Sequence, residues 1–130
     1  MTVCLDAWAV LAWLDGDEPA VSRIERALAD RPVISWINLV EVYCRIERDH
    51  GREAADETLR SLRASLAPEL PGTARMIDAA RIKARSALAL GDSFAIATAA
   101  AHGLALLTGD PEIIELAEAP CDVEDLRPGQ

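Results

Sequence analysis

The sequence predicts an α/β protein in which helices cover both faces of a short parallel sheet. Short apolar runs alternate with segments whose apolar residues recur at helical spacing. The apolar run at 104–107 is continuous, as expected of a strand that is buried on both faces. Strands joined by helices favour a parallel sheet with a helix layer on each side. The 130 residues fit one domain spanning 1–130, with little room for a second.

The first half of the chain is expected to alternate strands and helices that are separated by turn-forming residues. In order, we expect a strand at 2–5, helices at 7–14 and about 18–30, a strand at 33–34, and helices at 35–50 and 53–66. The turn Asp15-Gly16-Asp17 breaks the first helix. The helix that begins at 35 is expected to end at His50-Gly51, because glycine readily ends a helix.

The second half continues the alternation without an internal repeat, linker or low-complexity tract. In order, we expect a break at 68–72 with room for a short strand, a long helix from 73, an alanine-rich helix from 91 to 103, a strand at 104–107, a short helix after Pro111 and an edge strand at 121–123. Thr73 is expected to cap the long helix through its hydroxyl group.

The sequence is that expected of a cytoplasmic protein. No apolar run is long enough to span a bilayer. The apolar stretch at the N-terminus contains Asp6 and has no basic segment ahead of it, which disfavours a signal peptide. Cys4, Cys44 and Cys121 form no C-x-x-C pair and lie in apolar context. They are expected to be buried small side chains without a disulfide or zinc role.

Four acidic residues are expected to gather at one edge of the sheet. Asp6 follows the first strand, and Asp110 follows the strand at 104–107. Glu41 and Asp92 lie near the starts of helices, and helices that connect parallel strands begin at the carboxyl edge of the sheet. In open α/β sheets, ligands bind beyond that edge. The predicted topology therefore makes it the candidate site.

Each of these acids also has a purely structural explanation. Asp92 and Asp110 are placed as helix N-caps. Glu41 fits the second position of a capping box that begins at Asn38. Asp6 fits a turn residue at the end of a strand.

The combination of four acids is harder to explain without a cation. Carboxylates at one edge repel one another, and this repulsion raises their pKa values unless a positive charge neutralises them. Mg²⁺ takes oxygen ligands, needs only a few carboxylates and keeps several waters. A site without cysteine or histidine indicates Mg²⁺ or Mn²⁺. Hydrolysis of a phosphodiester is a natural reaction for such a site.

Four stretches of the sequence are similar to those of one family. They are residues 3–6 (VCLD), 34–42 (ISWINLVEV), 90–97 (LGDSFAIA) and 107–112 (LTGDPE). On these stretches the chain resembles the PIN-domain ribonucleases, and most closely the VapC-type toxins of bacterial toxin–antitoxin pairs. They span nearly the whole chain in the family's order. The resemblance implies a single PIN-like domain, built as a three-layer α/β/α sandwich with a short central parallel sheet.

The resemblance also implies roles for individual residues. The family's acidic quartet maps onto Asp6, Glu41, Asp92 and Asp110. Asp6 and Asp92 then resemble the principal metal ligands, and Asp110 and Glu41 complete the cluster directly or through water. Thr108 resembles a hydroxyl residue at the family's site, and Asn38 a residue near its rim. Ser35 is the expected cap of its helix, which disfavours the capping box.

As a member of this family the chain would be a cytoplasmic endoribonuclease that uses Mg²⁺ or Mn²⁺. It would be the toxin of a toxin–antitoxin pair, cutting cellular RNA and inhibiting translation. The resemblance further implies a homodimer, and a cognate antitoxin whose tail covers the active site.

The charge of the chain opposes an RNA substrate. The formal net charge of −9 repels nucleic acid at long range, so metal and local arginines have to offset it. Arg45, Arg48 and Arg52 recur at helical spacing on the helix of Glu41 and are the candidate RNA contacts. In the alternative, they lie on a solvated face and pair with neighbouring acids, namely Glu47, Asp49 and Glu53.

Other functions fit the residues less well. A phosphotransferase of the haloacid dehalogenase type needs a second aspartate two residues after Asp6, where Trp8 stands. A receiver domain needs a late lysine, but Lys83 precedes Asp92. Two alternatives stay open. One is a non-catalytic PIN-like binding partner that uses the acids to bind metal or antitoxin. The other is a structure-specific DNA nuclease, although 130 residues leave little room for DNA-grasping elements.

Overall fold

The centre of the protein is a sheet of five parallel strands in the order β3-β2-β1-β4-β5. The computed structural model describes residues 1–129. The strands are β1 (Cys4–Leu5), β2 (Val33–Ser35), β3 (Ala67–Glu69), β4 (Leu106–Thr108) and β5 (Val123–Asp125). The central strand β1 pairs with both β2 and β4. The predicted parallel sheet is confirmed, and β5 is the expected edge strand, two residues later than predicted.

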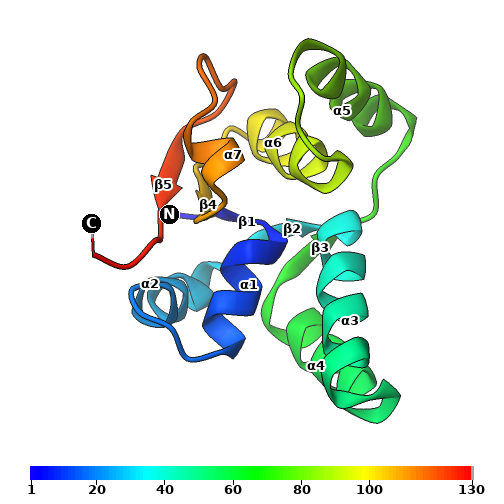
Figure 1. The fold of residues 1–130 in the computed structure, drawn as a ribbon, viewed down its shortest axis with the longest axis vertical. Helices are drawn as coiled ribbons and strands as arrows, with labels where there is room; N and C mark the ends of the chain where they lie inside the picture. Colours follow the sequence, from blue (N-terminus) through cyan, green and yellow to red (C-terminus); the bar gives the residue numbers. More distant parts are fainter. Residues whose placement is uncertain (130) are drawn as a thin grey trace.

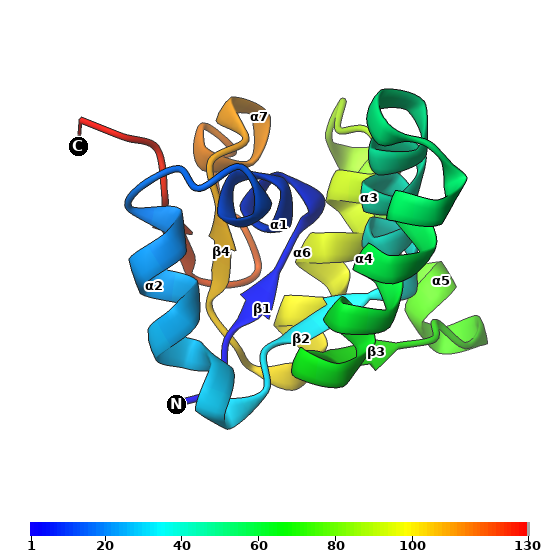
Figure 2. The same cartoon turned by 90° about the horizontal axis from the view of Figure 1, so that it is seen from below.

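Helices cover both faces of this sheet. They are α1 (Ala7–Leu14), α2 (Ala20–Ala27, continued by a 3₁₀ turn at Leu28–Asp30), α3 (Trp36–His50), α4 (Arg52–Ser65), α5 (Thr73–Arg85), α6 (Leu90–His102) and α7 (Pro111–Ile114). Figure 1 shows α5 and α6 on one side of the strands and α1, α2 and α4 on the other. In Figure 2, α1 and α2 lie in front of the sheet and α6 lies behind it. The predicted three-layer sandwich is therefore confirmed.

Alternate residues of the central strands pack against opposite helix layers. Leu5, Ile34 and Leu107 belong to the core shared with α1 to α4. Cys4 and Leu106 belong to the core shared with α6 and α7. All five side chains are fully buried. The pairing of neighbouring strands sets these residues side by side, so each face of the sheet presents one apolar row to its helix layer.

The helix starts differ in how closely they follow the sequence prediction. Ser35 is the N-cap of α3, and its Oγ accepts a hydrogen bond from the backbone N–H of Ile37 at 3.2 Å, as predicted. Thr73 is wrong as a cap: it is the first residue of α5, and Gly72 takes the N-cap position without a side-chain bond. Pro19 precedes α2, which begins at Ala20, two residues later than expected.

The three cysteines differ in their burial. Cys4 is buried in the sheet, Cys121 is partly buried, and Cys44 is exposed on α3. The prediction that all three are buried is therefore wrong for Cys44. It lies two positions after the buried Val42, about 200° around the helix, and so faces away from the core.

None of the helices within residues 1–129 has both the length and the apolar composition needed to cross a bilayer.

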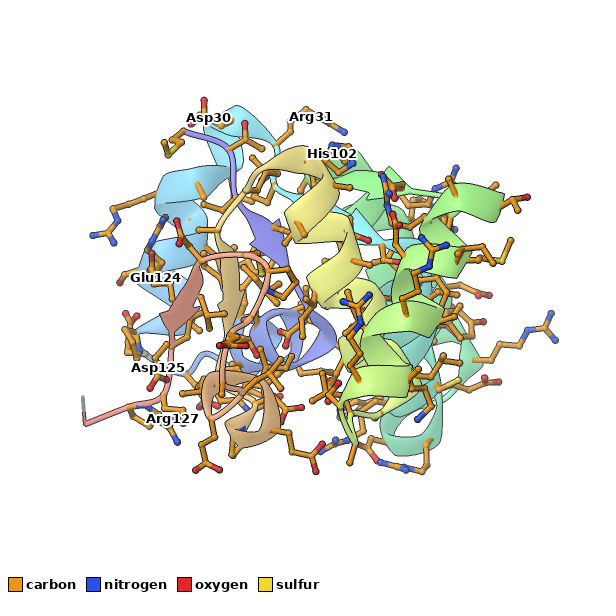
Figure 3. The ribbon with its side chains drawn as sticks, turned by 90° about the horizontal axis from the view of Figure 1, so that it is seen from above. Asp30, Arg31, His102, Glu124, Asp125 and Arg127 are labelled. Atoms are coloured by element: carbon orange, nitrogen blue, oxygen red, sulfur yellow. The ribbon has the colours of Figure 1, made fainter. Side chains whose placement is uncertain are left out.

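An ion-pair cluster fastens the edge strand β3 to α5 and α6. Arg75 donates hydrogen bonds to both carboxylate oxygens of Glu69, at 2.6 and 3.3 Å, and His102 contacts the same carboxylate. Burial acts to raise the pKa of the Glu69 carboxyl, but the hydrogen bonds and charges of Arg75 and His102 outweigh it, so this pKa lies below its ordinary value. Figure 3 shows His102 at the same end of the molecule as Asp30 and Arg31.

Replacing Glu69 by Gln is expected to destabilise the protein at neutral pH by about 1 kcal/mol, because a charge-assisted contact of a side chain that is only 20% exposed is lost. A carboxyl whose pKa is lowered by folding stabilises the fold above its ordinary pKa, and this stabilisation is lost as the pH falls through the folded-state pKa. Thermal unfolding should therefore separate wild type from Glu69→Gln at pH 7 and bring them together near pH 3.

The control is Asp49→Asn, which removes an exposed ion pair with Arg45 and should leave the melting temperature unchanged. If Glu69→Gln melts like wild type at pH 7, the cluster does not fasten β3.

Candidate metal site

Asp6 connects the central strand to the first helix. Its Oδ1 accepts a hydrogen bond from the backbone N–H of Ala9 at 2.8 Å, so Asp6 is the N-cap of α1 rather than a simple turn residue. Its Oδ2 accepts a hydrogen bond from the hydroxyl of Thr108. The side chain is only 2% exposed. Asp6 is therefore held in one orientation at the middle of the sheet's carboxyl edge.

Thr108 links Asp6 to Asp110. Its hydroxyl donates to Asp6 and accepts a hydrogen bond from the backbone N–H of Asp110 at 3.0 Å. Asp110 is the N-cap of α7, as predicted, and its Oδ1 accepts from the backbone N–H of Glu112 at 2.9 Å. Because β1 and β4 are neighbours, Thr108 contacts Asp6 although the two residues lie 102 positions apart in the sequence.

Asp92 does not cap its helix, and the N-cap prediction for it is wrong. Helix α6 begins at Leu90, with Ala89 at the N-cap position, so Asp92 is the third helical residue. Its carboxylate is not used in capping and approaches the carboxylate of Asp110 instead. Its place in the first turn still suits an acid, since the N-terminus of a helix carries partial positive charge.

The carboxylates of Asp92, Asp110 and Glu112 converge. One oxygen from each lies within 4.8 Å of the other two. Two oxygens that bind the same Mg²⁺ are about 3–4 Å apart, so small movements would bring this group to coordination distance. The sequence prediction missed Glu112. The sequence did hold one signal for it: Glu112 lies two residues after Asp110, in the first turn of the helix that Asp110 caps, so its side chain starts close to that of Asp110.

Glu41 approaches the cluster from α3. The amide Nδ2 of Asn38 donates to Glu41 Oε1 at 2.9 Å and to the backbone carbonyl of Gly91 at 3.1 Å. A Cβ atom on Gly91 would overlap the Glu41 carboxylate, which therefore lies against the start of α6. The capping-box explanation of Glu41 is wrong, because Ser35 caps α3. Asn38 is 1% exposed and so lies inside the protein rather than at the rim of the site.

Burial and crowding raise the pKa of two of these acids. For Asp6, burial is the largest cause; hydrogen bonds from Thr108 and Ala9 oppose it, the other acids add to it, and the pKa is about 7. For Asp92, burial and then the neighbouring carboxylate of Asp110 raise the pKa to about 7. A divalent cation would relieve this repulsion, and a set of carboxylate oxygens suits Mg²⁺ or Mn²⁺.

The arginines predicted to contact RNA do not lie on one helix. Arg45 donates a hydrogen bond to Asp49 at 2.9 Å, and Arg48 lies 3.6 Å from the same carboxylate. Gly51, with φ of 93°, ends α3, and Arg52 begins α4. The expectation of a single stripe on the helix of Glu41 is therefore wrong for Arg52. A role for these arginines towards RNA stays a prediction.

Comparisons with known proteins give a match to one family model and several matches of fold among solved structures. The sequence matches the family model of the PIN domain over residues 3–119. A search of curated proteins gives no significant match. Among solved structures, the chain is similar to one in the DNA-bound VapBC2 complex of Rickettsia felis. The TM-score is 0.80 and the identity 13%, and the match covers 98% of this chain and 100% of that chain.

Two further solved structures show the same fold. The DNA-bound VapBC complex of Salmonella typhimurium matches with a TM-score of 0.77 and 20% identity, over 96% of this chain and 98% of that chain. VapC20 of Mycobacterium tuberculosis, described as a sarcin-ricin loop cleaving toxin, matches with a TM-score of 0.67 and 16% identity, over 89% of this chain and 97% of that chain. At these identities the similarity establishes the fold.

Replacing Asp92 by Asn is expected to stabilise the metal-free protein near pH 8. The pKa of Asp92 is about 7 in the folded state, against an ordinary value of 3.8. Between these values the folded state binds more protons than the unfolded chain, so stability falls as the pH rises through this range. The amide that replaces the carboxylate carries no charge for Asp110 to repel. In chelator near pH 8, the melting temperature of Asp92→Asn should exceed that of wild type. The expected rise is about 3 °C for each kcal/mol gained in the free energy of unfolding.

The control is Asp17→Asn, which changes an exposed residue and should leave the melting temperature unchanged. Near pH 5 the advantage of Asp92→Asn over wild type should shrink, because Asp92 is then mostly protonated in the folded wild type. A melting temperature for Asp92→Asn at or below that of wild type near pH 8 would show that Asp92 is not under repulsion.

Proposed function

Because the chain belongs to the PIN-domain family, we propose that it is a Mg²⁺- or Mn²⁺-dependent endoribonuclease, a phosphodiester hydrolase whose one domain spans residues 1–130. One observation carries the proposal. The carboxylates of Asp92, Asp110 and Glu112 converge beside the buried Asp6 at the carboxyl edge of the sheet. This is the edge at which open α/β sheets bind their ligands.

The residues that would hold the cation are Asp6, Asp92 and Asp110, with Glu112 on the exposed side. Bound Mg²⁺ or Mn²⁺ would activate a water, orient the phosphate and stabilise the departing oxygen. Each oxygen of Asp6 already accepts one hydrogen bond and keeps a further lone pair for a metal. The Thr108 hydroxyl fixes the orientation of Asp6 and the backbone of Asp110, so the ligands are arranged before any ion binds.

Glu41 would help to bind the cation through a water molecule, since its charge acts on both Asp6 and Asp92, and it would act as the proton acceptor at the side of this cluster. Its Oε1 accepts the hydrogen bond from Asn38, while its Oε2 accepts none from residues 1–129. Oε2 can therefore accept a hydrogen bond from a water molecule beside the phosphate and take up its proton. The placement of Glu41 against the first turn of α6 keeps it close to Asp92.

We also propose that the chain is a cytoplasmic toxin that inhibits translation by cutting cellular RNA. Support comes from the similar folds found in the VapBC complexes of Rickettsia felis and Salmonella typhimurium, and in a Mycobacterium tuberculosis toxin described as cleaving the sarcin-ricin loop. A cognate antitoxin whose tail covers the acidic edge would then be its partner. The candidate RNA contacts Arg45, Arg48 and Arg52 belong to the same proposal.

The proposed homodimer is supported by exposed apolar side chains on α3, on α5, at the start of α6 and between β3 and α5. These are Leu70, Leu90, Val40, Met76 and Ile77, of which the first is 78% exposed and the others 45% or more. Large apolar side chains that are left exposed are candidates for burial in an interface with another protein. A second copy of the chain could bury these side chains in a shared interface.

Two other functions compete with this one. A non-catalytic PIN-like binding partner would use the acids for metal or antitoxin binding alone. A structure-specific DNA nuclease would use the same metal chemistry on a different substrate. The raised pKa values of Asp6 and Asp92 favour a bound cation in each case, so only a cleavage experiment separates the three.

Cleavage of a cellular RNA pool is expected in Mg²⁺ or Mn²⁺ and not in chelator. Asp92→Asn should cut at least about 100-fold more slowly. Even the outer partners of metal ligands cost 10–100-fold when they are replaced, and Asp92 is proposed as a direct ligand. The rate of disappearance of intact RNA, resolved on a gel, is the measurement.

Asp17→Asn, exposed on the turn after α1, is the control and should cut like wild type. Matched RNA and DNA oligonucleotides in the same assay test the DNA alternative. If the folded, antitoxin-free protein cuts neither substrate with either metal, it is not a nuclease, and the binding-partner function takes its place.

Replacing Glu112 by Gln is expected to weaken Mn²⁺ binding about tenfold, because one of three converging carboxylates is lost while the cap of α7, made by Asp110, is kept. Titration calorimetry with Mn²⁺ measures the dissociation constant. Glu115→Gln, at the other end of the same short helix, is the matched control and should bind like wild type. Equal affinities for all three proteins would place Glu112 outside the metal site.

A further inference from the structure

We propose that Asn38 and Gly91 are positioning residues that hold the Glu41 carboxylate in one place beside Asp92. The inference rests on the proposed function of the acidic edge and adds how one of its acids is oriented. Asn38 lies on α3 and Gly91 on α6, so the contacts between them also fix α3 against the start of α6.

The orientation of the Asn38 amide is dictated by its neighbours. Its Nδ2 group faces Glu41 Oε1 at 2.9 Å and the carbonyl oxygen of Gly91 at 3.1 Å. Both neighbours are acceptors, so the reverse orientation of the amide would set oxygen against oxygen. Asn38 is 1% exposed, and water therefore does not compete for its two N–H groups. One buried amide thus ties the carboxylate of Glu41 to the backbone of α6.

Packing alone does not account for an asparagine at this position. The Oδ1 atom of Asn38 is buried and has no hydrogen-bond partner within residues 1–129. A buried acceptor without a partner is costly, and a leucine of similar shape would fill the same space without that cost. The favourable contribution of Asn38 therefore lies in its two donors, one of which serves Glu41.

Gly91 makes room for the carboxylate that Asn38 holds. It is the second residue of α6, and its φ is not among the positive values, so the backbone does not require glycine. Alanine is the better helix former. A Cβ atom at this position would, however, overlap all three atoms of the Glu41 carboxyl group. The absence of a side chain at residue 91 is therefore a requirement of Glu41.

Glu41 needs such support because of its surroundings. Apart from its carboxylate, the side chain lies on the exposed side of α3, where a glutamate is free to change its torsion angles. Asn38 on one side and Gly91 on the other limit it to one arrangement before metal or substrate binds. Catalytic groups that are oriented in advance lose less freedom on reaching the transition state.

The test compares Asn38→Leu and Gly91→Ala with wild type in three measurements: thermal unfolding, Mn²⁺ affinity and RNA cleavage. Both variants are expected to melt at or above the temperature of wild type. Asn38→Leu removes an unpartnered buried oxygen, and Gly91→Ala improves the helix while the flexible carboxylate moves aside. Both are expected to lose about tenfold in kcat and in Mn²⁺ affinity, with little change in the KM for RNA.

A second set of variants shows whether the loss acts through Glu41. In a Glu41→Ala background, adding Asn38→Leu or Gly91→Ala should lower neither kcat nor Mn²⁺ affinity any further. If Asn38 and Gly91 had a purely structural role, each added substitution would lower kcat and Mn²⁺ affinity by the same factor as it does in wild type. Two matched controls accompany these variants. Thr98→Val removes a second buried side-chain oxygen that has no partner within residues 1–129, on α6, and Gly72→Ala adds a methyl group into open space; both should keep full activity.

The outcomes separate this inference from the proposed function. If wild type cuts no RNA, the nuclease proposal fails, and Mn²⁺ affinity with the unfolding data still decides the role of Asn38 and Gly91. The inference is overturned if either variant binds Mn²⁺ like wild type, or if its loss is repeated in the Glu41→Ala background. A large drop in melting temperature for Asn38→Leu would also overturn it, since Asn38 would then be needed for the fold.

Discussion

At the carboxyl edge of the sheet, Asp6 and Asp110 leave neighbouring strands and Asp92 faces them from the first turn of α6, so that their charges repel. This repulsion is a direct result of parallel strand order, because every strand ends, and every connecting helix begins, at the same edge. Together with burial, which is the larger cause, this repulsion raises the pKa values of Asp6 and Asp92 to about 7. The folded chain keeps these acids together against an electrostatic cost that a divalent cation would remove.

The hydrogen bonds at this edge hold the acids in positions where their negative charges repel one another. Asp6 and Asp110 are both helix caps, and each accepts a backbone N–H from the helix that it begins. Thr108 joins the two, and Asn38 holds Glu41. Capping and metal binding, which look like alternative explanations of an aspartate in the sequence, are therefore compatible roles of one side chain. The positive N-termini of the helices favour the same negative charges that a metal ion would bind.

The acids at this edge also differ from other acids of the molecule in their ion pairing. Away from this edge, many acids are paired: Glu69 with Arg75, Asp49 with Arg45, and Glu124 with Arg23. The acids of the edge have no such cation within residues 1–129. In a chain with a net charge of −9, a bound divalent ion is the means by which this surface could accept a phosphate.

The order of strands and helices, and the edge at which Asp6, Asp92 and Asp110 meet, could be predicted from the sequence, because both follow from local periodicity and the rules of parallel sheets. The start of α6 could not, so Asp92 was misplaced as a cap. Glu112 joins the acidic cluster, and the Glu41 carboxylate lies against Gly91, only in the folded chain. Such contacts depend on the exact distance and rotation between elements, which the packing of the whole chain decides and no local pattern records.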